Sequence, residues 1–384
     1  ANDAVIEVLK AGNKLAFEER YEHSYPHCWR SKTPVIFRAM DQWFVNIDHD
    51  GFRDKALAAI DGVNWVPGWG RSRIEGAVQS RPDWCISRQR SWGVPIPAFY
   101  DAQGEPILDA RIVRNTANLV QENGSNVWFE RDVADLWTAV KPDDWDGAEP
   151  VAKSTDTLDV WIDSGSSSRT VLMQRSELGR PGAEAGTPDA WQADYYLEGS
   201  DQHRGWFQSS LLLSLAGNGV APYRNVLTHG FMVDADREKI SKSKQAGGST
   251  KPQTAEAYVG EYGADIVRLW VASQDFRNDI TVSEERIKKV AEAYRGIRNA
   301  FRYQLSNLYD FDPAQHTVPD ADLTGLDRWM LDQFSTVQSD VTAAYERFEY
   351  HVVYQRISQF VSVELSAIYH DCIKDRLYAE ATNA

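Results

Sequence analysis

The feature that most restricts the fold is an apolar strand–helix–strand pattern within residues 155–235. The pattern predicts strands at Tyr195–Leu197 and Asn225–Val233, and the run between them, Gly205–Ala216, is apolar and of helical length. Two strands joined through a helix at this spacing predict a βαβ unit with a parallel sheet. A further buried strand is predicted at Leu158–Ile162, so this part of the chain is expected to be an α/β fold.

The chain changes character at Glu284, from which apolar residues recur every three or four positions. Ile287, Val290 and Tyr294 begin the first apolar stripe, and two similar stripes follow it. An antiparallel α-helical bundle is therefore predicted for residues 284–384.

The rest of the chain carries weaker patterns. The spacing predicts a helix over Ala4–Leu15 and a strand over Thr33–Val45. Residues 49–80 are expected to be helical and then irregular, because glycines and a proline interrupt them. The acidic segment 101–153 is expected to be an insertion with one short helix near Val133–Val140.

Composition and charge narrow the class of protein. The 384 residues allow two or three domains. The formal charge of −15 argues against a general nucleic-acid coat, although it leaves room for a local basic patch. No apolar run approaches the ~20 residues of a membrane span, so no membrane partner is expected.

The three cysteines are an odd number and form no Cys-x-x-Cys pair. This predicts neither a disulfide framework nor a structural zinc, and favours a reduced, cytoplasmic protein. The first residues, Ala1-Asn2-Asp3, show neither an initiator methionine nor the pattern of a signal peptide. The chain is therefore expected to be cut from a longer protein.

The most specific polar segment is Lys239-Ile240-Ser241-Lys242-Ser243, which follows the last predicted strand. Two lysines on a flexible loop can close over a polyphosphate, and as mobile point charges they can meet negative charge that develops in a transition state. Taken alone, a Lys-x-x-Lys pair in a loop is more often a solvated surface run.

A second polar segment, Glu198-Gly199-Ser200-Asp201-Gln202-His203, comes directly after the strand predicted at Tyr195–Leu197. In open α/β sheets, ligands bind at the carboxyl ends of the strands, which favours a binding role for this segment. The competing interpretation is a helix N-terminus in which Ser200 or Asp201 caps the helix around Trp206.

A third segment, Asp159–Ser167, contains Trp161 at the end of a predicted strand. Trp161 and Trp206 are candidate walls of a pocket. Core packing is the alternative for both, because a tryptophan more often belongs to the core.

These three segments together resemble the class I aminoacyl-tRNA synthetases, and most sharply the isoleucyl-tRNA synthetases among them. Lys239–Ser243 looks like the second signature of the class, Lys-Met-Ser-Lys-Ser, with Ile240 in place of the methionine. Further strings that resemble the family follow in the family's order: Tyr25-Pro26-His27-Cys28-Trp29-Arg30, Asp83–Arg90, Asp159–Ser166, Glu198–Phe207, Gly263–Trp270 and Leu326–Trp329.

The resemblance implies an α/β protein: the second half of a class I Rossmann nucleotide-binding fold with inserted segments, followed by an α-helical bundle of the anticodon-binding type. The implied domains are, in chain order, the exit of the editing insertion (1–48), a return segment and connective insertion (49–154), the Rossmann catalytic half (155–235), the signature loop with the stem-contact region (236–283), and the start of the helical anticodon-binding domain (284–384).

The resemblance also implies an isoleucine–tRNA ligase. Such an enzyme uses ATP with Mg²⁺ to convert L-isoleucine to isoleucyl-adenylate and then transfers the isoleucyl group to tRNA(Ile), with no role for DNA. The implied site residues are Lys239 and Lys242 for catalysis; Ser241, Lys242, Ser243 and His229 for ATP; Glu198, Gly199, Asp201 and Gln202 for the aminoacyl-adenylate; and Trp161 and Trp206 for the amino-acid side chain.

A basic stripe on the first bundle helix is a candidate contact for tRNA. Arg295, Arg298 and Arg302 are spaced by three and four residues, which places them on one helix face where they could meet phosphates. The alternative is a solvated face whose arginines pair with Glu292.

The sequence also departs from the family pattern. The family's first signature, His-Ile-Gly-His, is absent, and so are the threonine-rich and Gly-Thr-Gly parts of its editing site. Two alternatives therefore stay open: a catalytically incomplete, synthetase-like tRNA-binding module, and a ligase for another aliphatic amino acid such as valine. On either view, the isolated chain is expected to be inactive.

We predict that Lys242→Ala in the full-length enzyme lowers kcat for adenylate formation with little change in the KM for isoleucine. A mobile lysine acts mainly in the transition state, so its removal should cost about 2–4 kcal/mol of transition-state stabilisation. Isoleucine-dependent ATP–pyrophosphate exchange measures both constants, with Lys251→Ala in the same loop as the control. An unchanged kcat would remove Lys242 from the mechanism.

Overall fold

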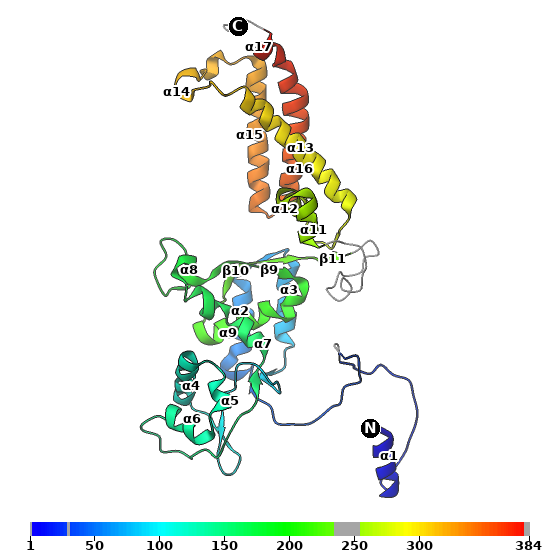
Figure 1. The fold of residues 1–384 in the computed structure, drawn as a ribbon, viewed down its shortest axis with the longest axis vertical. Helices are drawn as coiled ribbons and strands as arrows, with labels where there is room; N and C mark the ends of the chain where they lie inside the picture. Colours follow the sequence, from blue (N-terminus) through cyan, green and yellow to red (C-terminus); the bar gives the residue numbers. More distant parts are fainter. Residues whose placement is uncertain (1, 29–30, 234–253, 380–384) are drawn as a thin grey trace. The chain divides into compact units, whose positions relative to one another are not determined.

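The structure, a computed structural model, describes residues 2–28, 31–233 and 254–379. The chain divides into two compact units, residues 1–44 and 45–384, and each is described by itself. Figure 1 labels the elements along the chain.

The first unit contains the helix α1 (Asn2–Ala11), which confirms the predicted helix but ends before Leu15. Asn13 has a φ of 50°, a left-handed conformation that terminates a helix. The strand predicted over Thr33–Val45 is wrong for most of its length, because only Phe44–Val45 (β1) has strand geometry. Its apolar residues Ile36 and Phe37 are 76% and 78% exposed, so within this unit the apolar pattern has no surface to pack on.

The second unit is built on a parallel sheet of three strands in the order β2 (Asn64–Val66), β10 (Tyr223–His229), β9 (Ala193–Gly199). The helix α9 (Trp206–Asn218) connects β9 to β10, which confirms the predicted βαβ unit. The strand β2 comes from residues that we expected to be irregular, so sequence reasoning missed one strand of this sheet.

Apolar helices pack against the sheet. Phe207 and Leu211 of α9 are fully buried among residues from the strands, including Tyr196 and Tyr223. The hydroxyl of Tyr223 donates a hydrogen bond to the carbonyl of Phe207 at 3.0 Å. This contact fixes α9 on the strands and so holds the start of the helix next to the end of β9.

Two helices before the insertion complete this core. They are α2 (Phe52–Asp61) and α3 (Trp69–Gln79), which contribute the fully buried residues Ala56 and Ile74. The expectation that the second half of 49–80 is irregular is wrong. Gly62 ends α2 and Gly68 precedes α3, whereas Gly70 and Gly76 lie inside α3 without breaking the helix.

The segment predicted as a strand at Leu158–Ile162 is mostly helical. Only Thr157–Leu158 (β8) pairs as a strand, and Val160–Gly165 forms the helix α7. The carboxylate of Asp159 accepts a hydrogen bond from the backbone N–H of Trp161 at 3.3 Å. Aspartate in this position caps a helix, which is why the strand stops here.

The insertion has an apolar core of its own around Phe99, Trp128 and Leu136. The predicted helix is confirmed as α6 (Val133–Val140). The sequence analysis missed a longer helix, α4 (Ala110–Asn123), although its Asp109 cap follows the ordinary rule. The insertion's remaining elements are β5 (Phe99–Tyr100), β6 (Pro106–Ile107), β7 (Ala152–Lys153) and α5 (Val127–Glu130).

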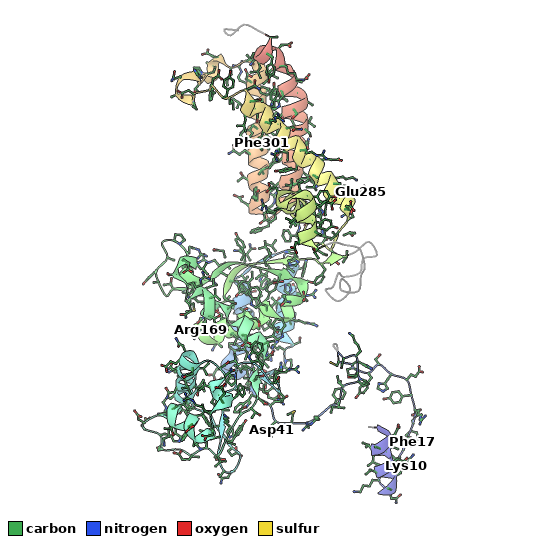
Figure 2. The ribbon with its side chains drawn as sticks, viewed as in Figure 1. Lys10, Phe17, Asp41, Arg169, Glu285 and Phe301 are labelled. Atoms are coloured by element: carbon green, nitrogen blue, oxygen red, sulfur yellow. The ribbon has the colours of Figure 1, made fainter. Side chains whose placement is uncertain are left out.

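The predicted helical bundle is confirmed. Its core lies between helices and includes Met330, Val337 and Phe360, while Phe301 remains 57% exposed (Figure 2). The helices of this region are α11 (Ala255–Tyr262), α12 (Ala264–Ala272), α13 (Glu284–Ser306), α15 (Gly325–Glu346), α16 (Tyr350–Phe360) and its continuation η6 (Val361–His370).

The short elements complete the description. They are η1 (His49–Gly51), β3 (Trp84–Cys85), β4 (Ser87–Arg88), η2 (Ser168–Leu172), η3 (Ser176–Leu178), α8 (Pro188–Trp191), η4 (Ser200–Arg204), β11 (Met232–Val233), β12 (Ile280–Thr281), α14 (Pro313–His316), η5 (Asp320–Asp322) and α17 (Lys374–Tyr378). Within the described ranges, none of the helices combines the length and the apolar composition that a membrane crossing requires.

Candidate active site

The carboxyl edge of the parallel sheet gathers half of the predicted site residues that the structure describes. In the register of the two strands, Gly199 at the end of β9 lies beside His229 at the end of β10, and Glu198 lies beside Thr228. Glu198 is exposed, and His229 is half-buried. Asp201 and Gln202 follow in η4, so the turn after β9 places two carboxylates and an amide at this edge, and β10 adds the imidazole of His229.

Gln202 caps the helix α9. Its side-chain oxygen accepts a hydrogen bond from the backbone N–H of Trp206 at 2.9 Å, and its amide group donates to Asp201 at 3.1 Å. The competing interpretation, in which Ser200 or Asp201 caps this helix, is therefore wrong. A longer side chain from within the turn reaches the N–H group instead, and this fixes the conformation of the turn.

His203 supports the same turn from the buried side. It was not among the predicted site residues. Its ring is fully buried, and Nδ1 lies 3.0 Å from the carbonyl oxygen of Ser200. The ring also contacts Trp65 and Trp69. Burial lowers the pKa of the His203 imidazole, so the ring is held neutral and Nδ1–H can donate to that carbonyl. Its place in the polar segment after β9 was the only sequence signal for this role.

Trp161 and Trp206, the two tryptophans predicted to form the pocket wall, both lie next to Gly205. Trp206 stacks on Tyr196 with ring centroids 4.0 Å apart, and its indole N–H donates to the carbonyl of Ser164 in α7 at 2.9 Å. Trp161 is 39% exposed. A Cβ atom at Gly205 would lie 2.9 Å from the Trp161 ring and 2.6 Å from the Gln202 oxygen. Glycine therefore permits the close approach of α7, η4 and α9.

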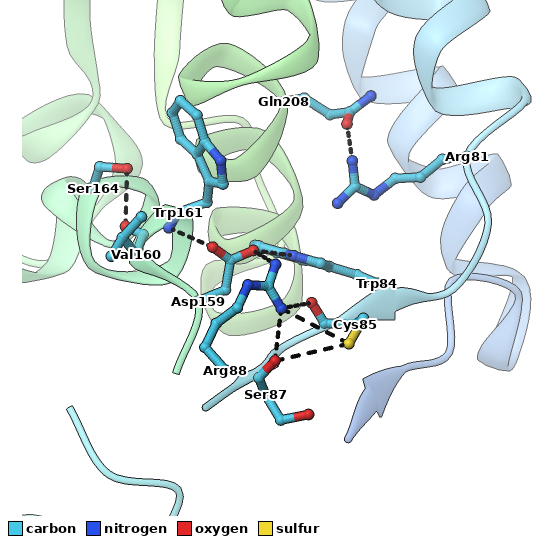
Figure 3. A network of polar contacts seen from close by, with 10 residues as sticks. All are labelled: Arg81, Trp84, Cys85, Ser87, Arg88, Asp159, Val160, Trp161, Ser164 and Gln208. Carbon is cyan, nitrogen blue, oxygen red and sulfur yellow. Dashed lines mark hydrogen bonds and ion pairs between the residues drawn. The ribbon is translucent and has the colours of Figure 1, made fainter. Parts of the chain in front are cut away.

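A cleft of about 330 Å³ opens beside Trp161. At its centre, the buried carboxylate of Asp159 accepts hydrogen bonds from the indole of Trp84 at 3.1 Å and from Arg88 at 2.8 Å (Figure 3). The full lining is Arg81, Pro82, Asp83, Trp84, Cys85, Arg88, Asp159, Trp161, Arg204, Gly205 and Ser209.

The arginines of this cleft were missed by sequence reasoning. The segment Asp83–Arg90 was noted only as a string that resembles the family, and nothing in it indicated where its side chains pointed. The structure brings Arg81 and Arg88 to the same cleft as Trp161 and Arg204, which lie far along the chain.

The remaining predicted residues are placed differently. The segment Lys239–Ser243 lies outside the described residues. Arg295, Arg298 and Arg302 are exposed on α13, and no ion pair joins them to Glu292 or to any other residue in the described ranges. In the same ranges, no group of three or more histidine, cysteine, aspartate or glutamate side chains could hold a metal ion.

Two protein-family models match the chain. Residues 7–283 match the model for class I tRNA synthetases (I, L, M and V). Residues 327–384 match the model for the anticodon-binding domain of tRNA ligases.

The chain is similar to curated isoleucine–tRNA ligases. It is 50% identical to that of Nitrosococcus oceani over 98% of this chain and 38% of that relative. It is 49% identical to that of Geobacter sulfurreducens, again over 98% of this chain and over 39% of that relative. The chain thus spans about two fifths of the length of these relatives.

Solved structures show the same fold at low sequence identity. Mycobacterium tuberculosis methionyl-tRNA synthetase bound by methionyl-adenylate has a TM-score of 0.57 at 18% identity, over 94% of this chain and 58% of that structure. A LeuRS–tRNA–LeuAMS complex from Agrobacterium radiobacter K84 has a TM-score of 0.53 at 19% identity, over 73% and 35%.

We predict opposite effects of the same substitution at two glycines. Gly205→Ala should destabilise the chain by about 1–3 kcal/mol, because the added methyl group overlaps Gln202 and Trp161. Gly296→Ala should stabilise α13 by about 0.5–1 kcal/mol, because no described atom outside the neighbouring helix backbone lies within 4 Å of the added carbon and alanine favours a helix. Thermal unfolding of both variants measures the two shifts. Equal shifts would mean that Gly205 has no packing role.

Proposed function

This chain belongs to the class I tRNA synthetases, and we propose that the protein containing it is an isoleucine–tRNA ligase. The proposal covers L-isoleucine, ATP and tRNA(Ile) as the substrates of that protein, with Mg²⁺ accompanying the nucleotide to screen the charge of its phosphates. A cytoplasmic location follows from the need to supply translation.

The observation that carries the proposal is the turn at the carboxyl edge of β9. Its polar side chains face the place where open α/β sheets bind ligands, and α7 brings Trp161 next to it. The choice of isoleucine is supported by the relatives that are 50% and 49% identical and are named isoleucine–tRNA ligases.

The proposed reaction has two steps. A carboxylate oxygen of isoleucine attacks the α-phosphorus of ATP, and pyrophosphate leaves. The hydroxyl of the terminal ribose of tRNA then attacks the acyl carbon, and AMP leaves. Neither step needs a covalent bond to the protein, so the protein contributes positioning and electrostatic stabilisation.

Residues at the sheet edge are suited to this positioning. The exposed carboxylate of Glu198 can bind the ammonium group of isoleucine, and Gly199 lets the adenylate approach the backbone. His229 lies across from Gly199 and can contact the nucleotide. Asp201 and Gln202, which are hydrogen-bonded to each other, are proposed to contact the aminoacyl-adenylate. Trp161 and Trp206 are proposed to offer apolar surface to the aliphatic side chain. Lys239, Ser241, Lys242 and Ser243 are proposed to hold the phosphates.

The proposal predicts that the full-length protein catalyses ATP–pyrophosphate exchange that depends on isoleucine, whereas the isolated 384-residue chain does not. The isolated chain lacks the first signature of the family, so its ATP site is incomplete. Valine and a no-amino-acid sample are the controls. A higher kcat/KM for valine than for isoleucine, or no exchange by the full-length protein, would contradict the proposal. Exchange by the isolated chain would show that the ATP site lies elsewhere.

A further inference from the structure

The residues that follow β10 are held by a segment from later in the chain. Residues 275–282, between α12 and α13, run beside Gly230–Val233, and β11 and β12 pair in parallel within this contact. Backbone N–H groups donate to backbone carbonyls in three places: from Gly230 to Phe276 at 2.8 Å, from Ile280 to Phe231 at 2.8 Å, and from Val282 to Val233 at 3.2 Å. The helical region is thereby joined to the carboxyl edge of the parallel sheet.

One further link in this contact is made by a side chain. The backbone N–H of Phe231 donates to the carboxylate of Asp279 at 2.7 Å. Asp279 is exposed, and its carboxylate forms no other hydrogen bond or ion pair with the residues that the structure describes. Its structural contact is therefore with a single peptide group, the one between Gly230 and Phe231.

The backbone of Asp279 is itself held close to that peptide group. A Cβ atom at Gly230 would lie 2.2 Å from the carbonyl oxygen of Asn278 and 2.6 Å from the backbone nitrogen of Asp279. Only glycine permits two backbones to approach so closely. The approach places the Asp279 carboxylate within reach of the next N–H group along the chain.

The same peptide group also orients a residue of the proposed site. Its carbonyl, that of Gly230, lies 2.7 Å from Nδ1 of His229. A carbonyl oxygen can only accept, so Nδ1–H is the donor, and Nε2 is the ring nitrogen left to contact a ligand. Its N–H side leads to the Phe231 ring, which would lie 3.1 Å from a Cβ atom at Gly199. His229 and Gly199 are the residues proposed to meet the nucleotide and the adenylate.

We infer that Asp279 is a positioning residue for the nucleotide, acting through the Gly230–Phe231 peptide on His229, an inference that rests on the proposed function. A peptide group is planar, with its N–H and its C=O on opposite sides. A carboxylate that fixes the direction of the N–H therefore also fixes the carbonyl that holds the imidazole of His229. A hydrogen bond to an ionised acceptor is stronger than one to a neutral acceptor, which suits it to this role.

The amino-acid end of the proposed site is held by other contacts. The side chain of Gln202 accepts from the backbone of Trp206, and the indole of Trp206 donates to Ser164. Residues 275–282 take no part in these bonds. Loss of the Asp279 carboxylate should therefore disturb ATP more than isoleucine.

The test compares Asp279→Ala with Asp279→Asn in the full-length protein. Isothermal titration gives the Kd of ATP, and isoleucine-dependent exchange gives the KM of each substrate. Asp279→Ala should raise both constants for ATP roughly fivefold to tenfold, because a charge-assisted hydrogen bond is lost, with little change in the KM for isoleucine. Asparagine keeps an acceptor oxygen in the same position, so Asp279→Asn should retain most of the affinity for ATP.

Two controls separate positioning from general damage. Asp310→Ala removes an exposed aspartate beyond the end of α13 that forms no hydrogen bond or ion pair with the described residues, and it should change none of these constants. In a His229→Ala background, Asp279→Ala should have little further effect on the Kd of ATP, since residues that act through one another are not additive. Melting temperatures show whether each variant is folded.

The inference is overturned if Asp279→Ala leaves the Kd of ATP unchanged, or if it raises the constants for ATP and isoleucine by the same factor. It is also overturned if Asp279→Asn is as weak as Asp279→Ala, or if the effects of Asp279→Ala and His229→Ala add in full. A protein that binds ATP but shows no isoleucine-dependent exchange would contradict the proposed function alone. The titrations with ATP would still decide whether Asp279 acts through His229.

Discussion

The proposed site depends on a single buried carboxylate. Asp159 is only 4% exposed, and a carboxylate in such a place is unfavourable unless its oxygens accept hydrogen bonds. It accepts from the indole of Trp84, from Arg88 and from the backbone of Trp161. These bonds tie the segment after α3 to the start of α7. The hydrogen bonds of Asp159 therefore fix the position of Trp161. Trp161 in turn forms one wall of both the proposed pocket and the cleft.

The parallel pairing of β9 and β10 supplies the other half of the site. A parallel register places the carboxyl ends of both strands at the same edge, so Gly199 and His229 become neighbours although they lie thirty positions apart in the sequence. The buried ring of His203 then supports the turn that leaves β9. The carboxyl edge of the sheet and the cleft beside Trp161 are therefore held by different interactions, and both adjoin Gly205.

Much of this arrangement was predictable where local patterns and tertiary packing agree. The βαβ unit and the bundle follow from apolar spacing, and the polar turn after β9 follows from its place at a strand end. The strand predicted at Leu158–Ile162 failed because the capping of α7 by Asp159 outweighed an apolar run. The strand β2 was missed because three residues carry too short a pattern to recognise, and only pairing with β10 defines it.

The cleft could not be predicted for a physical reason. Whether an arginine is compensated depends on which carboxylate reaches it in three dimensions, and sequence spacing does not give that. Arg88 pairs with the carboxylate of Asp159, 71 positions away, whereas Arg81 donates to the neutral side chain of Gln208, 127 positions away. A phosphate-binding role for Lys239 and Lys242, in contrast, was predicted from two lysines in a polar loop and from the family resemblance, and it remains a prediction.

The central claim is that the turn after β9 and the start of α7 together hold the aminoacyl-adenylate. Amide hydrogen exchange of the full-length protein, with and without a non-hydrolysable analogue of isoleucyl-adenylate, tests it most directly. We expect slower exchange on binding at residues 198–206 and 159–165, and no change in the insertion helix α4. Protection that spares both segments while the analogue is bound would contradict it.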